Sequence, residues 1–135
     1  MNTVSSPRVL VVLLNYRTAE MTLRAAAAAL ADMPADAEMV IIDNASGDGS
    51  AEVLDEGIKK MGQGPRVRLI LSQVNGGFGA GNNIGLNSKM SDGGAPDYFY
   101  VLNSDAFPDP GCIGTLLAHL ETHPKAGFAL SLIHI

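Results

Sequence analysis

Two oxygen-bearing side chains come directly after one apolar run of the chain. Residues 98–102 read YFYVL, and Asn103 and Asp105 follow them. In an extended chain, residues i and i+2 project from the same face, so this amide and this carboxylate would point the same way. At the carboxyl end of a parallel strand, such a pair suits a hard divalent cation that also binds phosphate oxygens. The alternative is a polar turn, with Pro108 and Pro110 ending the strand.

A further carboxylate ends another apolar run. Residues 38–43 read EMVIID, so Asp43 closes a predicted strand. In that position its carboxylate can accept a hydrogen bond from a ribose hydroxyl or from a pyrimidine N–H. The alternative is capping of the helix that follows, a role that Asp48 or Ser50 can already fill.

A glycine-rich loop at residues 75–85 reads NGGFGAGNNIG. It is not the dinucleotide fingerprint G-x-G-x-x-G, because the third glycine is missing after both Gly77 and Gly79, and it lacks the Gly-Lys-Ser/Thr of a Walker A loop. The remaining functional interpretation is a backbone that closely approaches a flat base or ribose, with Asn82 or Asn83 supplying a donor and an acceptor. The alternative is a helix start whose small residues allow close packing.

The composition is that of a globular protein with one domain or part of one. The 135 residues are 47% hydrophobic and 17% charged, and the formal net charge is -5. This charge argues against a nucleic-acid or anionic-membrane partner, since both attract clustered Lys and Arg, although a nucleotide can bind if a metal neutralises its phosphates. The single cysteine, Cys112, excludes an intrachain disulfide. No run approaches the roughly 20 apolar residues of a membrane span, so we expect a cytoplasmic protein.

Short apolar runs alternate along the chain with segments of helical period. The predicted strands are residues 8–14, 38–43, 67–71 and 98–102. The predicted helices are residues 19–33, 50–61, 78–90 and a fourth that begins at Asp109 and Pro110. This alternation predicts right-handed βαβ units and a mainly parallel sheet in a three-layer α/β/α fold. The polar residues after the strands should therefore meet at one edge of the sheet, where ligands bind in such folds.

The patterns also predict how individual elements are buried. In the first helix, with Thr18 as its N-cap, we expect Leu23, Ala27 and Leu30 to form the apolar face. The strand at 98–102 is apolar throughout and is expected to be buried, whereas the strand at 67–71 alternates and is expected nearer an edge.

Four segments in this order resemble the N-terminal half of family 2 glycosyltransferases, especially the branch with rhamnosyltransferase-like proteins. The matching segments read VVLLNY (11–16), VIIDNAS (40–46), NGGFGAGNNIG (75–85) and LNSDA (102–106). The resemblance implies a GT-A fold, which is a Rossmann-like nucleotide-diphospho-sugar transferase fold, present here in truncated form. It also implies transfer of a sugar from a UDP- or dTDP-sugar to an acceptor hydroxyl, with inversion at the anomeric carbon.

The resemblance further implies the roles of individual residues. Asp105 would bind Mg2+ or Mn2+ on the donor diphosphate, where the cation neutralises charge on the leaving group. The family's usual aspartate at the first position of this motif is Asn103 here, so we expect weaker metal binding. The nucleotide-binding residues implied in this way are Asn15, Tyr16, Asp43, Asn75, Gly77, Asn82, Asn83 and Asn103.

The family's catalytic base lies in the C-terminal half, in an acidic Glu-Asp segment that this chain does not reach. We therefore expect residues 8–129 to be the donor-binding part of a GT-A domain, inactive alone and with no catalytic residue of its own. Residues 1–7 are expected to be a flexible leader. Residues 130–135, LSLIHI, match one reading frame of a transposon-end sequencing adapter at six of six positions, so we expect a non-native tail.

The implied partners are a nucleoside-diphosphate sugar and a glycan or lipid-linked acceptor, in the synthesis of cell-envelope polysaccharide. The full-length form would then work in the cytoplasm, with the inner face of the membrane as an alternative location. Two other functions stay open from the sequence: a free-standing nucleotide-binding or regulatory module without catalysis, and a sugar nucleotidyltransferase.

Overall fold

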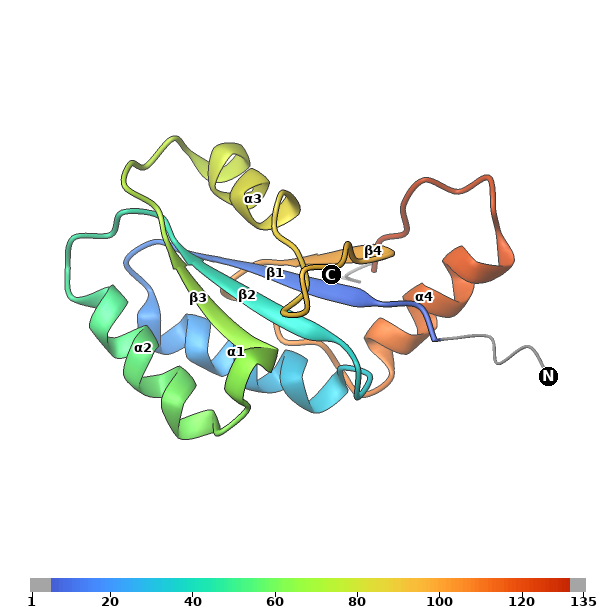
Figure 1. Ribbon diagram of the computed structural model, residues 1–135, viewed down its shortest axis with the longest axis horizontal. Helices are drawn as coiled ribbons and strands as arrows, with labels where there is room; N and C mark the ends of the chain where they lie inside the picture. Colours follow the sequence, from blue (N-terminus) through green and yellow to red (C-terminus); the bar gives the residue numbers. More distant parts are fainter. Residues whose placement is uncertain (1–5, 132–135) are drawn as a thin grey trace.

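Four parallel strands form the centre of the structure, a computed structural model that describes residues 6–131 (Figure 1). Their order across the sheet is β3-β2-β1-β4. The strands are β1 (Val9–Asn15), β2 (Glu38–Asp43), β3 (Val67–Leu71) and β4 (Tyr98–Leu102). The helices are α1 (Ala19–Asp32), α2 (Ser50–Met61), α3 (Phe78–Leu86) and α4 (Cys112–Thr122), with a 3-10 turn at Gly64–Arg66. Most of the predicted leader and tail, residues 1–5 and 132–135, lies outside the described residues.

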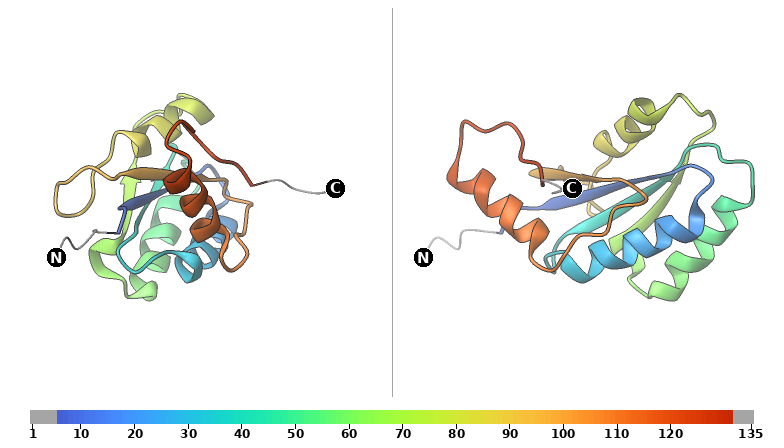
Figure 2. Two further views of the ribbon diagram at one scale, coloured as in Figure 1. Left: turned by 90° about the vertical axis from the view of Figure 1, so that its right-hand side faces the viewer. Right: turned by 180° about the vertical axis from the view of Figure 1, so that it is seen from behind.

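Helices cover both faces of the sheet. Helices α1 and α2 lie on one face and α3 on the other (Figure 2). The chain passes from β1 to β2 to β3 in one direction and then returns past β1 to form β4. Because crossovers between parallel strands share one hand, this reversal places α3 opposite α1 and α2. The predicted three-layer fold with a parallel sheet is thus confirmed, as is the edge position of β3.

The two central strands carry the core. Every residue of β1 and β2 is buried, because both strands have neighbours on each side and helices on each face. Alternate side chains divide into two clusters. The cluster toward α1 and α2 contains Val9, Val11, Leu13, Met39, Ile41, Ala25, Ala26, Ala29 and Leu54. The cluster toward α3 contains Leu10, Val12, Leu14, Val40, Ile42 and Met90.

The buried face of α1 differs from the predicted one. Leu23 and Leu30 are partly buried as expected, but Ala27 is exposed. The fully buried residues of this helix are Thr22, Ala25, Ala26 and Ala29. A run of alanines carries no hydrophobic period, so the pattern could not show which of them face the sheet.

Helix α3 lies very close to the sheet. A Cβ atom on Gly81 would lie 2.6 Å from Leu14 Cδ1, and a Cβ atom on Gly85 would overlap the side chain of Val12. At these two positions the glycines allow close packing, which was the structural alternative for this loop. The helix ends at Leu86 rather than at residue 90, and Met90 instead turns back into the core beneath β1 and β2.

The start of α4 also differs from the prediction. The helix begins at Cys112, after Gly111 with φ 88°, and not at Pro110 with Asp109 as its cap. Its first amides are bound by Asp32 at the end of α1. The Asp32 carboxylate accepts hydrogen bonds from the backbone N–H of Gly111 (2.6 Å) and of Ile113 (2.9 Å).

Strand β4 is less buried than its sequence predicts. Phe99 is 39% exposed and Val101 is 46% exposed, while Leu102 is buried. Phe99 pairs in register with Leu10 and so shares the face of the sheet that α3 covers. Helix α3, however, packs on β1 and β2, which leaves the β4 part of that face open.

Candidate functional site

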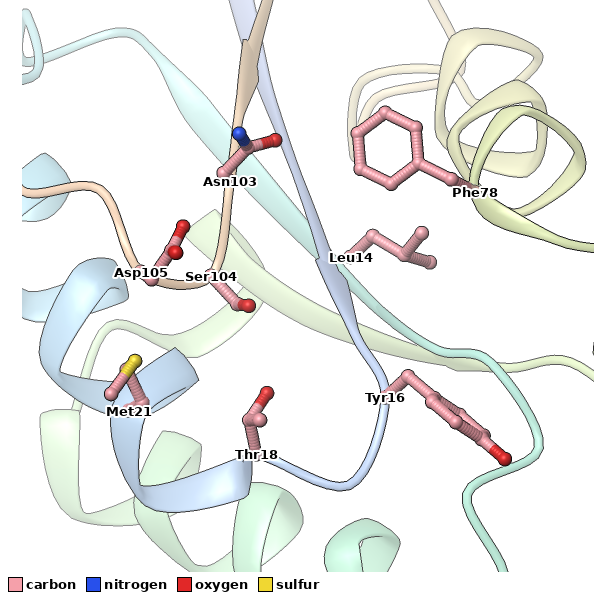
Figure 3. Close-up of a pocket in the computed structure, with 8 residues that line it drawn as sticks. All are labelled: Leu14, Tyr16, Thr18, Met21, Phe78, Asn103, Ser104 and Asp105. Carbon is pink, nitrogen blue, oxygen red and sulfur yellow. The ribbon is translucent and has the colours of Figure 1, made fainter.

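The carboxyl ends of the strands meet at one edge of the sheet, as expected for parallel strands. A cavity of about 370 Å3 opens there. Its lining comes from the end of β1, the start of α1, the start of α3 and the turn after β4 (Figure 3). The lining residues are Leu14, Tyr16, Thr18, Met21, Phe78, Asn103, Ser104 and Asp105.

The turn after β4 presents free oxygen atoms to this cavity. The backbone N–H of Ala106 donates to the carbonyl of Asn103 at 3.0 Å and closes the turn. The side chains of Asn103 and Asp105 are exposed and make no hydrogen bond with any described residue. The two alternatives from the sequence, a polar turn and a pair of oxygen ligands, are therefore compatible. The turn is closed by backbone groups, which leaves both side chains free to bind a ligand.

A single carboxylate, Asp105, stands at this position. Within residues 6–131, no group of three or more His, Cys, Asp or Glu side chains could hold a metal ion. A cation at Asp105 would therefore need further oxygen ligands from phosphate or water. This donor set fits Mg2+ or Mn2+, because such ions often keep several waters and bind through one or two carboxylates plus substrate phosphates.

A buried polar network lies behind the cavity and joins the ends of β1 and β2. Asn15 is fully buried, and its Nδ2 donates to Asp43 Oδ1 (2.9 Å) and to Ser46 Oγ (3.3 Å). Its Oδ1 accepts from the hydroxyl of Thr22 (2.6 Å) and from that of Thr18 (3.4 Å). All the hydrogen-bonding capacity of this amide is thus used inside the protein.

The carboxylate of Asp43 belongs to the same network. Oδ1 also accepts from the hydroxyl of Ser46 (2.6 Å), and Oδ2 accepts from the backbone N–H of Ser46 (3.3 Å). Asp43 does not cap α2. That contact comes from Asp48, whose Oδ1 accepts from the backbone N–H of Ser50 at 3.0 Å. Hydrogen bonding by Ser50 lowers the pKa of the Asp48 carboxyl, and the nearby charge of Arg17 adds to this effect.

Two non-glycine residues beside this network have left-handed backbones. Arg17 has φ 56° and Ala45 has φ 57°. The guanidinium of Arg17 lies 5.2 Å from the centre of the Tyr16 ring, and Tyr16 lines the cavity. The sequence alone does not single out Arg17 or Ser46, because nothing in a short polar loop signals a backbone conformation or a buried hydroxyl.

A pair of asparagines fixes the start of the glycine-rich loop. Asn44 Nδ2 donates to Asn75 Oδ1 (3.0 Å) and to the carbonyl of Gly77 (3.3 Å). Asn75 Oδ1 in turn accepts from the backbone N–H of Gly77 at 2.8 Å. These contacts connect the end of β2 to the residue before Phe78, whose ring lines the cavity.

Asn82 and Asn83 do not line the cavity. Asn82 is buried, and its Nδ2 donates to the carbonyl of Phe78 in the same helix at 3.1 Å. Its Oδ1 is buried without a partner among the described residues. Asn83 is exposed.

A second, larger cavity of about 760 Å3 adjoins the first, and Asp105 borders both. The side chains of Tyr100, Phe107 and Leu116 make its lining largely apolar. Burial raises the pKa of Tyr100, and its hydroxyl lies 3.8 Å from Cys112 Sγ. No helix among the described residues is long and apolar enough to cross a bilayer.

Residues 9–135 match a family model described as Glycosyl transferase family 2. No curated protein matches the sequence.

Solved structures resemble the fold. One is a mannosyltransferase from Pyrobaculum calidifontis, PcManGT, in complex with GDP-Man and Mn2+, with 20% identity, a TM-score of 0.71 and coverage of 87% of this chain and 33% of that chain. Another is TarS 1-349 from S. aureus in complex with UDP-GlcNAc, with 18% identity, a TM-score of 0.66 and coverage of 87% and 32%. The chain thus spans about a third of these structures, and the predicted GT-A fold is confirmed.

Proposed function

Because the chain belongs to glycosyl transferase family 2, we propose that it is the donor-binding part of an enzyme that transfers a sugar with inversion from a nucleoside diphosphate to an acceptor hydroxyl. The observation that supports this most directly is the pair of free oxygen side chains, Asn103 and Asp105, in a cavity that two aromatic residues also line. Oxygen donors suit a cation and its phosphates, and exposed aromatic faces suit a nucleoside base.

In this proposal Asp105 holds Mg2+ or Mn2+, with Asn103 as a weaker ligand. When bound, the cation neutralises the charge that builds on the departing diphosphate. Tyr16 and Phe78 lie on either side of Leu14 (Figure 3), and in this proposal both rings contact the nucleoside. UDP or dTDP is the donor nucleotide that we propose, and titration with GDP tests the choice of base.

The remaining predicted nucleotide ligands take supporting roles. Asn15 and Asp43 hold the strand ends together, since their polar atoms bind each other, Ser46 and the threonines. Asn75 and Gly77 hold the loop before Phe78. Asn82 donates to the carbonyl of Phe78 in the first turn of α3, and of the two asparagines only Asn83 is exposed and open to a ribose that extends beyond the cavity.

The acceptor side of the reaction needs residues beyond those placed so far. We propose a glycan or lipid-linked acceptor of cell-envelope synthesis; the second cavity adjoins Asp105, and its largely apolar lining suits the lipid of a lipid-linked acceptor. We propose that the catalytic base comes from a segment outside residues 8–129, so that this part binds donor without transferring sugar.

Isothermal titration with UDP, dTDP and GDP, each with and without MnCl2, tests the proposal. We expect UDP or dTDP to bind more tightly with Mn2+, and Asp105→Ala to remove that enhancement. Asp109→Ala removes another exposed carboxylate of the same loop and should leave the enhancement of binding by Mn2+ unchanged. Binding that is unaffected by Mn2+ would remove Asp105 from the proposed role, and no binding of any of the three nucleotides would contradict the donor site.

A further inference from the structure

Ser46 connects the ends of β1 and β2 more extensively than its place in a short loop suggests. Its hydroxyl donates to Asp43 Oδ1 (2.6 Å) and accepts from Asn15 Nδ2 (3.3 Å) and from the backbone N–H of Arg17 (2.9 Å). Its carbonyl accepts from Nε of Arg17 at 3.0 Å. The residue is only 1% exposed; its contacts with Asp43 and Asn15 are buried, and those with Arg17 are partly buried.

Among the residues that Ser46 contacts, Arg17 has an energetically unfavourable backbone conformation. A left-handed backbone at φ 56° is unfavourable for a residue with a long side chain, because its Cβ crowds the following carbonyl group. Ser46 binds Arg17 at two points, the backbone N–H and Nε, and so holds both the backbone and the base of the guanidinium. Such strain persists where the surrounding contacts over-determine the conformation.

Arg17 lies beside an aromatic ring of the cavity. Tyr16 precedes Arg17 in the turn from β1 to α1 and lines the cavity (Figure 3). The guanidinium lies 5.2 Å from the Tyr16 ring centre, within range of a cation–π contact. Its terminal nitrogens make no hydrogen bond with any described residue.

We propose that Ser46 is a positioning residue: its hydroxyl holds Arg17 in the left-handed conformation, and Arg17 thereby preorganises Tyr16 as one wall of the donor cavity. The inference rests on the proposed function only for its ligand, a nucleoside diphosphate. The wall itself is a property of the free protein, so it can be tested without any nucleotide.

The first test measures backbone amide hydrogen exchange by NMR in the nucleotide-free chain. We expect Ser46→Ala to speed exchange at the Arg17 amide by at least tenfold, while amides in the middle of β1 and β2 keep their protection. Ser46→Thr retains the hydroxyl and should restore protection of Arg17. An Arg17 amide that exchanges at the wild-type rate in Ser46→Ala would overturn the proposal.

A stability cycle covers the case in which Ser46→Ala folds poorly. Arg17→Gly removes the left-handed strain, because glycine adopts positive φ readily. If Ser46 holds that conformation, Ser46→Ala should lower Tm by at most half as much in the Arg17→Gly background as in the wild-type chain. Equal shifts in both backgrounds would show that Ser46 supports Asp43 and Asn15 alone and would overturn the proposal.

Titration with UDP and Mn2+ then tests the wall as part of the site. We expect Ser46→Ala to weaken binding about tenfold and Ser46→Thr to bind within about twofold of the wild type. Ser88→Ala is the matched control, because the Ser88 hydroxyl donates to the carbonyl of Ile84 on α3, away from the cavity lining. An unchanged Kd in Ser46→Ala overturns the role of the wall in binding. A wild-type chain that binds no nucleotide instead refutes the proposed function, and the exchange experiment still decides the role of Ser46.

Discussion

Asn15 and Asp43 are register partners at the carboxyl ends of β1 and β2, and the Asn15 amide donates to Asp43 Oδ1 at 2.9 Å. Neither side chain lines the cavity in front of them. Their hydrogen bonds instead fix the two loops that carry Tyr16 and Ser46. We therefore propose that Asn15 and Asp43, which the sequence predicts as nucleotide ligands, act by setting the geometry of these loops.

Asp43→Ala should destabilise the fold and weaken nucleotide binding together. The substitution removes the acceptor of Asn15 Nδ2 and of the Ser46 hydroxyl, and both donors are buried. We expect a loss of about 2–3 kcal/mol in the free energy of unfolding, since a buried unsatisfied donor costs roughly 1–3 kcal/mol. Urea denaturation measures this loss, and titration with UDP measures the binding. Asp48→Ala is the control, because Asp48 is exposed and binds one amide at the start of α2.

A fully stable Asp43→Ala that no longer binds nucleotide would show a direct contact between this carboxylate and the ligand. Full stability together with unchanged binding would contradict both assignments.

Gly85→Ala should destabilise the packing of α3 on the sheet, whereas Gly79→Ala in the same helix should not. A methyl group at residue 85 overlaps Val12, a β-branched side chain in the core, whereas one at residue 79 meets nothing within 4 Å. We expect Gly85→Ala to cost about 1–3 kcal/mol through overpacking. Gly79→Ala should be neutral or stabilise by up to about 1 kcal/mol, because alanine favours the helix. Thermal unfolding of the two variants compares them directly, and equal Tm values would contradict this packing.

The central part of the fold could be predicted because its signals are local. The continuous apolar runs of β1 and β2 identify strands covered on both faces, and the helical periods between them imply parallel pairing. The carboxyl-end location of Asn103 and Asp105 follows from that topology. The prediction that Ala27 is buried was wrong, because the alanine run of α1 contains no contrast between apolar and polar residues.

Contacts between distant segments could not be predicted. Asp32 lies 79 residues before Gly111, and no sequence pattern links a carboxylate at the end of one helix to the amides of another. The function of Ser46 depends in the same way on the register that brings Asn15 beside Asp43. Five consecutive apolar residues predicted that β4 is buried. The sequence of a strand does not show, however, whether helices cover both of its faces.

Asp32→Ala should loosen α4, and Asp109→Ala should leave it intact. Asp32 accepts two backbone N–H groups of the first turn of α4, whereas the Asp109 side chain accepts none from the described residues. Loss of a helix cap costs about 1–2 kcal/mol, which corresponds to roughly tenfold faster local opening. Hydrogen exchange of the α4 amides measures this opening. Faster exchange in Asp109→Ala than in Asp32→Ala would reverse the assignment of the cap in favour of the sequence prediction.

The 135-residue chain should self-associate through β4. This strand has one neighbour in the sheet, contains no charged residue, and exposes Phe99 and Val101 on a face that α3 leaves open. Unpaired strand edges with apolar side chains template pairing between chains. Light scattering should show an average mass that rises above that of the monomer as protein concentration increases. Val101→Lys should return the mass toward that of the monomer, because a lysine on the open face opposes burial.

The opposite edge provides the control for this prediction. Leu71 on β3 is 52% exposed, but β3 carries Arg68 and so already has the charge that discourages edge pairing. Leu71→Lys should therefore leave association unchanged. If Leu71→Lys dissociates the chains and Val101→Lys does not, the interface lies at β3. If the wild-type chain is a monomer at every concentration, the open face of β4 is tolerated in water without a partner, as single exposed apolar side chains commonly are.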